Sequence, residues 1–358
     1  MHAWSTALGA FLTVLILWDA FQTIILSRRV SRRLRPTRAF YRMLWTPIRA
    51  VVKRIPPGNR RENILMVFGP LSLLCLIALW AYGLILGVAL LHWGLGSQII
   101  GPGGITGFGV DLYMSGTTFF TLGLGDATPR TGIARALTVL ECGMGFAFLA
   151  LVIGYVPLIS EAFSRREVNI SMLDASAGSP PTAGQLILRH FRDDDADLRG
   201  LFRDWERWAA ELLESHISFP VLAYFRSQHD NQSWVAALTT LLDVCALVLT
   251  RVEDRPMPPA RLTFAIARHA VIDLCAIFRL PPTPPTVDRL SPADEGRLER
   301  LLAPAGVRLS AEAEAVAKFR TLRATYEPYV EALSSFLIMP LPDWMPPEGA
   351  KDAWHTMA

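Results

Sequence analysis

Three long apolar segments constrain this chain more than any other feature of its 358 residues. Crossing the hydrocarbon core of a bilayer takes a helix of about 20 mostly apolar residues. Residues 5–27 contain a single charged side chain, Asp19, residues 64–93 contain no Asp, Glu, Lys or Arg, and residues 132–160 contain two charged side chains. We therefore expect a membrane protein with three transmembrane helices.

Charge is unevenly distributed around these segments. Residues 28–62 carry twelve Arg or Lys and one acid, whereas residues 167–358 carry 19 basic and 26 acidic side chains. Basic residues that flank transmembrane helices stay in the cytoplasm. We therefore expect a multi-pass protein of the cell (plasma) membrane, with the N-terminus and residues 94–131 outside and the C-terminus in the cytoplasm.

The basic segment also contains aromatic residues, such as Phe40, Tyr41 and Trp45. A mixture of this kind is typical of a segment at the membrane surface and also of a nucleic-acid-binding stretch. Because two transmembrane helices flank it, membrane phosphates are the nearer partner. We expect residues 28–61 to bind anionic lipid headgroups, and we expect no nucleic-acid binding.

A short motif lies between the second and third apolar segments. Residues 111–120 are apolar but long enough only for a half-length helix. A hexapeptide follows at once, consisting of Thr121, Leu122, Gly123, Leu124, Gly125 and Asp126. Glycines at alternate positions allow positive φ angles and let successive carbonyls point toward one axis. Four such loops around an axis would form rings of carbonyl oxygens that replace the hydration shell of a cation.

This arrangement of apolar segment, short helix, TLGLGD and glycine-containing apolar segment resembles the pore module of prokaryotic potassium channels. These are pore-loop tetrameric cation channels whose usual filter reads TVGYGD. The resemblance covers residues 64–165 and implies a homotetramer that conducts K⁺ passively. It implies that K⁺ binds only at the selectivity filter, residues 121–126, and that the protein needs no cofactor.

Two departures from the usual filter bear on selectivity. Leu122 stands where the family has Val, and Leu124 stands where it has Tyr, so the aromatic cuff around the filter is missing. A poorly selective monovalent cation channel on the same scaffold therefore remains an alternative. A second alternative is a non-conducting membrane sensor or anchor protein. We expect no enzyme, because no nucleophile–base set and no metal-ligand spacing is present.

The resemblance also assigns roles in the third apolar segment. It implies that Phe146, Leu149 and Ile153 line the cavity below the filter. The gating hinge would consist of Gly145, Gly154 and Pro157, because glycine and proline allow a helix to bend. The alternative for the glycines is that small residues let membrane helices approach closely.

Glu141 lies within the third apolar segment, where an ionisable group is costly and is usually partnered or functional. We expect it to brace the filter by bonding Thr117, Thr118 or nearby backbone groups. The alternative is a side chain that reaches solvent near the outer interface.

Helical periodicity dominates the remainder of the chain. Leu198, Leu201, Trp205, Trp208 and Leu212 recur at three- and four-residue steps, and further helices are expected over 219–228, 232–252, 260–278 and 310–337. The fold class is therefore an all-α membrane protein, in which three transmembrane helices, a re-entrant pore helix and a selectivity filter per subunit precede a C-terminal cytosolic helical domain. Its ligand or protein partner stays open.

These observations predict the following organisation. The regions are a first transmembrane helix (1–27), a basic cytoplasmic or interfacial loop (28–62), a pore module (63–166), a linker (167–184), a cytosolic helical domain (185–340) and a tail (341–358). Within the pore module we expect an outer helix (64–93), a pore helix (111–120), the filter (121–126) and an inner helix (132–163).

Overall fold

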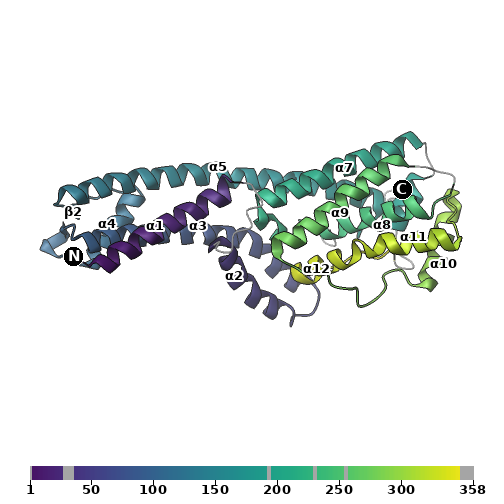
Figure 1. Ribbon diagram of the computed structural model, residues 1–358, viewed down its shortest axis with the longest axis horizontal. Helices are drawn as coiled ribbons and strands as arrows, with labels where there is room; N and C mark the ends of the chain where they lie inside the picture. Colours follow the sequence, from purple (N-terminus) through teal and green to yellow (C-terminus); the bar gives the residue numbers. More distant parts are fainter. Residues whose placement is uncertain (1, 27–35, 192–194, 229–231, 254–256, 347–358) are drawn as a thin grey trace. The chain divides into compact units, whose positions relative to one another are not determined.

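The computed structural model describes residues 2–26, 36–191, 195–228, 232–253 and 257–346 (Figure 1). The chain is divided into two compact units, Met1–Ser160 and Glu161–Ala358. Among the described residues, three helices are long and apolar enough to cross a membrane: α1 (Ala3–Ile24), α3 (Asn59–Leu95) and α5 (Gly132–Ala177). The predicted all-α membrane fold with three spans and a C-terminal helical region is confirmed.

Helix α1 lies along α3 (Figure 1), and glycines allow the two backbones to approach closely. A Cβ on Gly9 of α1 would lie 2.6 Å from the carbonyl oxygen of Gly87, and one on Gly94 of α3 would lie 2.5 Å from the backbone nitrogen of Thr6. Neither distance is tolerable for a carbon atom, so both positions require glycine. Small residues at helix interfaces are a common basis for helix pairing in membranes.

Asp19, the charged residue of the first apolar segment, is buried and joins three helices. Its carboxylate accepts a hydrogen bond from Trp80 Nε1 of α3 at 3.0 Å. It also accepts bonds from the backbone nitrogen of Thr37 at 3.1 Å and from the Thr37 hydroxyl at 2.5 Å, in the first turn of α2 (Pro36–Val52). A carboxylate satisfies the free N–H groups of a helix N-terminus and complements its dipole.

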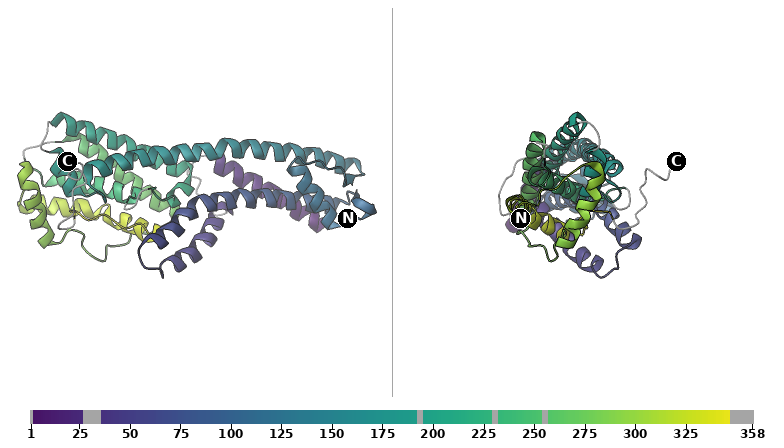
Figure 2. Two further views of the ribbon diagram at one scale, coloured as in Figure 1. Left: turned by 180° about the vertical axis from the view of Figure 1, so that it is seen from behind. Right: turned by 90° about the vertical axis from the view of Figure 1, so that its right-hand side faces the viewer.

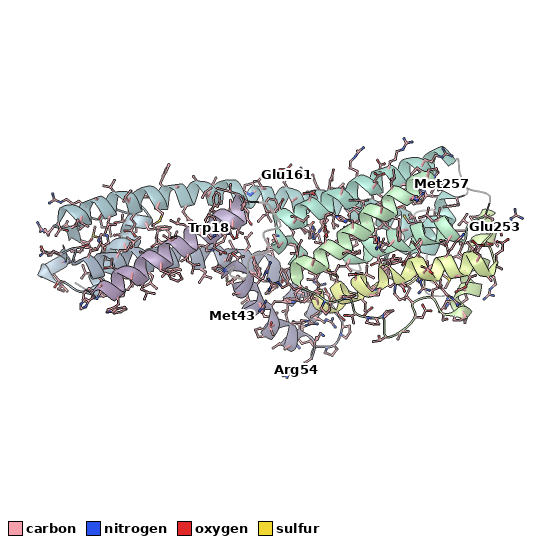
Figure 3. All side chains as sticks on the ribbon, in the orientation of Figure 1. Trp18, Met43, Arg54, Glu161, Glu253 and Met257 are labelled. Carbon is pink, nitrogen blue, oxygen red and sulfur yellow. The ribbon has the colours of Figure 1, made fainter. Side chains whose placement is uncertain are left out.

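The predicted loop over 28–62 is largely helical. Helix α2 continues through Pro47, and α3 begins at Asn59, five residues before the predicted outer helix. Packing explains the difference, since the Trp45 ring lies 4.8 Å from that of Phe68 and anchors α2 to α3. The opposite side carries Met43, which is 76% exposed (Figure 3). Residues 27–35, which carry five of the basic side chains, lie outside the described residues.

A small two-stranded sheet joins the two ends of the segment between α3 and α5. Strands β1 (Ile99–Ile100) and β2 (Thr128–Pro129) pair antiparallel, with Ile99 opposite Pro129. Between them lie the 3₁₀ turn η1 (Pro102–Gly104) and helix α4 (Phe108–Phe119). The short helix thus begins three residues earlier than predicted and ends one residue earlier.

Helix α5 is one continuous helix of 46 residues (Figures 1 and 2). The prediction that an inner helix ends at residue 163 and a linker occupies 167–184 is wrong over residues 167–177. The polar sequence contains a helical stripe of buried apolar residues, namely Ile170, Leu173 and Ala177. Burial of this stripe within the second unit stabilises the helix beyond the membrane segment.

The second unit is a bundle of helices. They are α6 (Ala183–His190), α7 (Asp195–Ser218), α8 (Trp234–Thr250), α9 (Pro258–Phe278), α10 (Pro292–Leu302), α11 (Ala313–Ala324) and α12 (Glu327–Leu337), with the 3₁₀ turns η2 (Pro220–Tyr224) and η3 (Ala303–Ala305). Helix α8 is buried on all sides and packs against α6, α9, α11 and α12. A helix that is apolar all around belongs in a core.

Several boundaries in this unit differ from the prediction. The helix expected over 219–228 is only the turn η2, and the one expected over 310–337 is two helices that divide where Pro328 opens α12. The predicted tail is also wrong at its start, because Trp344 is 1% exposed and its carbonyl accepts a bond from the Gly184 nitrogen at 2.8 Å. Residues 347–358 of that tail lie outside the described residues.

A charged cluster lies in the core of this unit. Asp243 of α8 accepts two bonds of 2.8 Å from the Arg289 guanidinium and one of 2.6 Å from the Tyr326 hydroxyl. Arg289 also contacts Glu327 at 3.3 Å. Because buried charges are tolerated only when they are paired and hydrogen-bonded, this cluster fixes how α8 meets α12 and the 279–291 segment.

Candidate functional site

The loop between α4 and β2 has an unusual backbone. The φ angle is positive at Thr121 (57°), Gly123 (55°) and Gly125 (77°), that is, at every second residue. This alternation lets neighbouring carbonyls face the same side, whereas they alternate in a strand. Thr121 is a β-branched residue in the left-handed region, a costly conformation that persists only where its surroundings impose it.

Both ends of this loop are held by α4. At the first end, the Leu122 nitrogen donates to the Thr117 carbonyl at 2.8 Å and the Thr121 nitrogen donates to the Thr118 carbonyl at 3.0 Å. At the other end, the Tyr113 hydroxyl donates to the Asp126 carboxylate at 2.8 Å. Tyr113 is not among the site residues predicted from the sequence. A tyrosine on the short helix and an aspartate at the end of the following loop, Asp126, were the signal for this bond.

Glu141 of α5 braces α4, but not through the predicted partners. Its Oε1 contacts the hydroxyl of Ser115, which also lies 2.8 Å from the Ile85 carbonyl of α3. The side chains of Glu141 and Ser115 are both buried. The Thr117 hydroxyl instead donates to the Met114 carbonyl of its own helix at 3.0 Å. Thr117 is turned about 200° from Ser115 around α4, so it cannot share that interface.

Gly145 is the point where α5 meets the end of α4. A Cβ at this position would lie 2.0 Å from the Phe119 carbonyl oxygen, whereas one at Gly154 would meet no atom within 4 Å. The helix stays continuous through Gly145, Gly154 and Pro157. The structure thus gives Gly145 the alternative role weighed from the sequence, close approach, and Phe119 immediately precedes the loop that it supports.

One chain leaves much of this region uncovered. Phe146, Leu149 and Ile153 follow one another around a single face of α5 and are 69%, 55% and 65% exposed. Leu122 and Leu124 of the loop are 61% and 63% exposed. Within an apolar stretch of 18 residues, 11% of α5 is buried, against 50% of α3. The loop and α5 therefore offer a large apolar surface to lipid or to further protein.

Comparisons with known proteins agree with this geometry. Residues 73–157 match the family model described as "Ion channel". An "Uncharacterized membrane protein YdjJ" of Bacillus subtilis (strain 168) is 24% identical over 149 residues, which make up 41% of this chain and 42% of that protein. The chain therefore matches less than half of the length of this relative. No solved structure matches the chain.

Proposed function

Because residues 73–157 match the ion channel family model and three helices are long and apolar enough to cross a membrane, we propose that the chain is the subunit of a homotetrameric potassium channel. K⁺ crosses passively through a filter of backbone carbonyls, supplied by residues 121–126 of each subunit. K⁺ is the permeant ion and the only bound metal that we propose.

The observation that carries this proposal is the backbone of the loop after α4. A half-length helix ends at Phe119 and is followed by residues with positive φ at every second position. This backbone supports a row of carbonyls facing one side, as cation coordination in a filter requires. The hydrogen bonds at both ends help to hold it in that form.

The uncovered surfaces support the tetramer. Leu122 and Leu124 would be covered by neighbouring subunits around a common axis, while Phe146, Leu149 and Ile153 would line the cavity below the filter. Carbonyls from one chain cannot surround an ion. A closed ring of identical subunits supplies the missing oxygens and covers the exposed side chains of the loop.

We further propose that the channel lies in the plasma membrane, with its N-terminus outside and its C-terminus in the cytoplasm. Anionic lipid headgroups bind the basic residues within 28–61. Gating occurs along α5, near Gly154 and Pro157, where a Cβ at Gly154 would meet no neighbouring atom.

A second candidate function follows from the two leucines of the loop. The side chains of Leu122 and Leu124 have no hydroxyl or ring nitrogen that could brace the filter from behind, and both are exposed in the chain. A loosely braced filter would favour a monovalent cation channel with little preference between K⁺ and Na⁺.

The test is planar-bilayer recording of the purified protein in mixed K⁺ and Na⁺ solutions. We expect a reversal potential near that of K⁺ in wild type. Gly123→Ala should abolish the current, because alanine costs about 1–2 kcal/mol per residue in the left-handed region that this position adopts. Gly143→Ala is the matched control, since a Cβ there meets no atom within 4 Å.

Each outcome decides between the candidates. A reversal potential that ignores the K⁺ to Na⁺ ratio would favour the poorly selective channel. No current from correctly assembled wild-type protein would overturn both channels and favour the sensor or anchor. Undiminished current in Gly123→Ala would remove residues 121–126 from the conduction path.

A further inference from the structure

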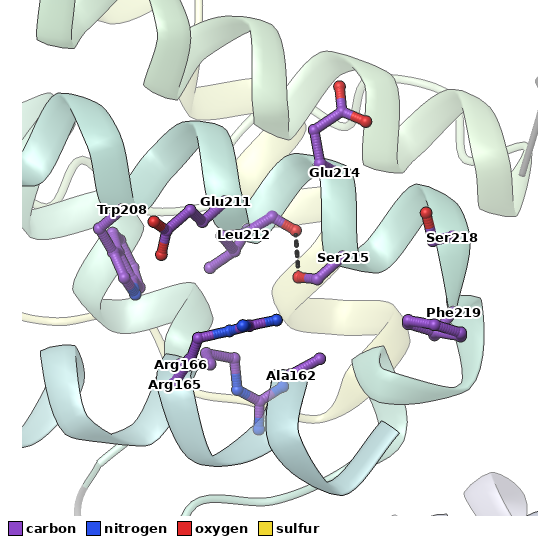
Figure 4. A pocket seen from close by; sticks show the side chains of 10 residues that line it. All are labelled: Ala162, Arg165, Arg166, Trp208, Glu211, Leu212, Glu214, Ser215, Ser218 and Phe219. Carbon is purple, nitrogen blue, oxygen red and sulfur yellow. Dashed lines mark hydrogen bonds between the residues drawn. The ribbon is translucent and has the colours of Figure 1, made fainter. Parts of the chain in front are cut away.

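A pocket of about 410 Å³ lies in the second unit, between α7 and the part of α5 that belongs to that unit (Figure 4). Ala162, Arg165 and Arg166 form its α5 wall, while α7 contributes an aromatic, two acidic and two hydroxyl-bearing side chains. Leu212 and Phe219 supply apolar surface. The volume is within the range of small-molecule sites, and the lining combines apolar surface with side chains of both charges.

Trp208 provides a hydrogen-bond donor without an acceptor. The side chain is 2% exposed, and its Nε1 is buried and has no hydrogen-bond partner among the described residues. In Figure 4 the indole extends from α7 toward the arginine side chains of α5, with its nitrogen at the leading edge. A buried donor without a partner is destabilising, so a ligand acceptor at this place would recover free energy.

The charges of the pocket lie on opposite walls. On α5, the Arg165 guanidinium forms an exposed ion pair with Glu161 at 2.9 Å, and solvent screening keeps such a pair weak. On α7, Glu211 is exposed and forms no ion pair among the described residues. Its carboxylate lies beside Trp208, whereas that of Glu214 points away from α5 (Figure 4).

Arg166 keeps the α5 wall in place rather than serving the ligand. Its guanidinium donates to the Leu222 and Phe225 carbonyls, both at 2.9 Å, and pairs with Glu167 at 2.9 Å. It also lies 3.4 Å from Nε2 of His216 on α7. All of these partners are within the second unit, and they hold this wall in the arrangement that forms the pocket.

We propose that this pocket binds a zwitterionic small molecule of the α-amino acid class with an aliphatic side chain. The carboxylate of the ligand accepts from Trp208 Nε1 and pairs with Arg165. Its ammonium group pairs with Glu211, and its side chain contacts Leu212. A ligand with only one charged group would pair with Glu211 alone or with Trp208 and Arg165 alone.

Binding at this pocket has a regulatory consequence, which rests on the proposed channel function. The pocket wall is α5 itself, the same continuous helix that carries Gly154 and Pro157. A ligand that contacts both α5 and α7 stabilises the arrangement of α5 in which the pocket exists. It therefore shifts the open probability by its difference in affinity for the open and closed states.

The test is isothermal titration calorimetry on the detergent-solubilised full chain. The probes are L-leucine, 4-methylpentanoate, which lacks the ammonium group, and 3-methylbutylamine, which lacks the carboxylate. We expect saturable binding of leucine and at least tenfold weaker binding of each singly charged analogue. Glu211→Gln should weaken leucine at least tenfold, whereas Glu214→Gln, the matched control, should bind like wild type.

Trp208→Phe keeps an aromatic ring but removes the N–H, and it should weaken leucine and 4-methylpentanoate together. Absence of leucine binding, equal binding of all three probes, or equal affinity in Glu211→Gln and Glu214→Gln would each overturn the proposal. Calorimetry needs no ion conduction, so failure here is distinguishable from failure of the channel. A bilayer recording with and without leucine then tests the regulatory consequence alone.

Discussion

Replacing Gly145 by alanine is the sharpest test of how α5 supports the loop. The new Cβ would lie 2.0 Å from the Phe119 carbonyl oxygen, and Cβ atoms essentially never come closer than 3.0 Å to another heavy atom. The end of α4 must therefore retreat by at least the difference, about 1 Å, since overpacked positions relax by backbone shifts that cost about 1–3 kcal/mol. Phe119 lies two residues before Thr121, so this displacement enters the loop directly.

The expected result is a loss of K⁺ current in Gly145→Ala of about 5- to 150-fold, the ratio that corresponds to 1–3 kcal/mol. The assay is bilayer recording at matched protein density, with size-exclusion chromatography to establish that the assembly forms. Gly154→Ala is the comparison variant. A Cβ at Gly154 meets nothing within 4 Å, so this change should leave the loop and the K⁺/Na⁺ permeability as in wild type, and any effect should appear in the gating proposed for this part of α5.

Wild-type current and unchanged K⁺/Na⁺ permeability in Gly145→Ala would refute this reasoning. In that case the Phe119 carbonyl does not rest on α5 in the working protein. A changed K⁺/Na⁺ permeability in Gly154→Ala but not in Gly145→Ala would likewise show that the loop does not rest on Gly145.

Three further substitutions test other contacts. Ser115→Ala removes the hydroxyl that joins α4 to α3 and α5, so we expect about 1–3 kcal/mol lower stability in thermal melts and a changed K⁺/Na⁺ permeability ratio. The control is Thr117→Val, which should behave as wild type because the Thr117 hydroxyl bonds a carbonyl of its own helix. Burial lowers the pKa of His216 to about 3, below its unfolded value near 6.5. The contribution of His216 to stability should therefore be constant above pH 6.5 and fall between pH 6.5 and 3, as the unfolded state takes up a proton. His216→Gln should flatten this dependence in acid melts, and an unchanged slope would exclude His216 as its cause. Asp243→Ala removes the two 2.8 Å bonds of the largely buried Arg289 guanidinium and leaves it only longer contacts, such as that with Glu327, so melts should show a loss of about 3–5 kcal/mol. Glu314→Ala, which removes an exposed pair, should leave the melting temperature close to that of wild type, and equal losses in the two variants would contradict the argument.

The membrane architecture was predictable because it depends on one-dimensional properties. Length and absence of charge identify a span without knowledge of its neighbours, and the three predicted spans correspond to α1, α3 and α5. The loop was predictable for a similar reason. The alternate glycines of residues 121–126 admit a backbone that other residues resist, and the φ angles at Gly123 and Gly125 are positive as expected.

Contacts between helices were less predictable, because they depend on how each helix is rotated about its axis. Glu141 was expected to act behind the loop, yet Ser115 and not Thr117 faces it, a choice that follows from the rotation of α4 between α3 and α5. The extension of α5 was missed because Ser, Asn and Asp in residues 167–177 are typical of a linker. Burial of Ile170 and Leu173 outweighs that local preference, and it depends on helices far away in the sequence.

The hydrogen bonds at the two ends of the loop have an entropic consequence. Fixing the backbone of one residue costs about 1–2 kcal/mol, so ordering residues 121–126 costs roughly 6–12 kcal/mol. The bonds from Leu122 to Thr117 and from Tyr113 to Asp126 place this cost within folding. In the proposed channel, a cation that arrives at the loop would meet a backbone that folding has already ordered at both ends. Its binding free energy would then reflect mainly the exchange of water oxygens for carbonyl oxygens, which keeps binding weak enough for rapid release.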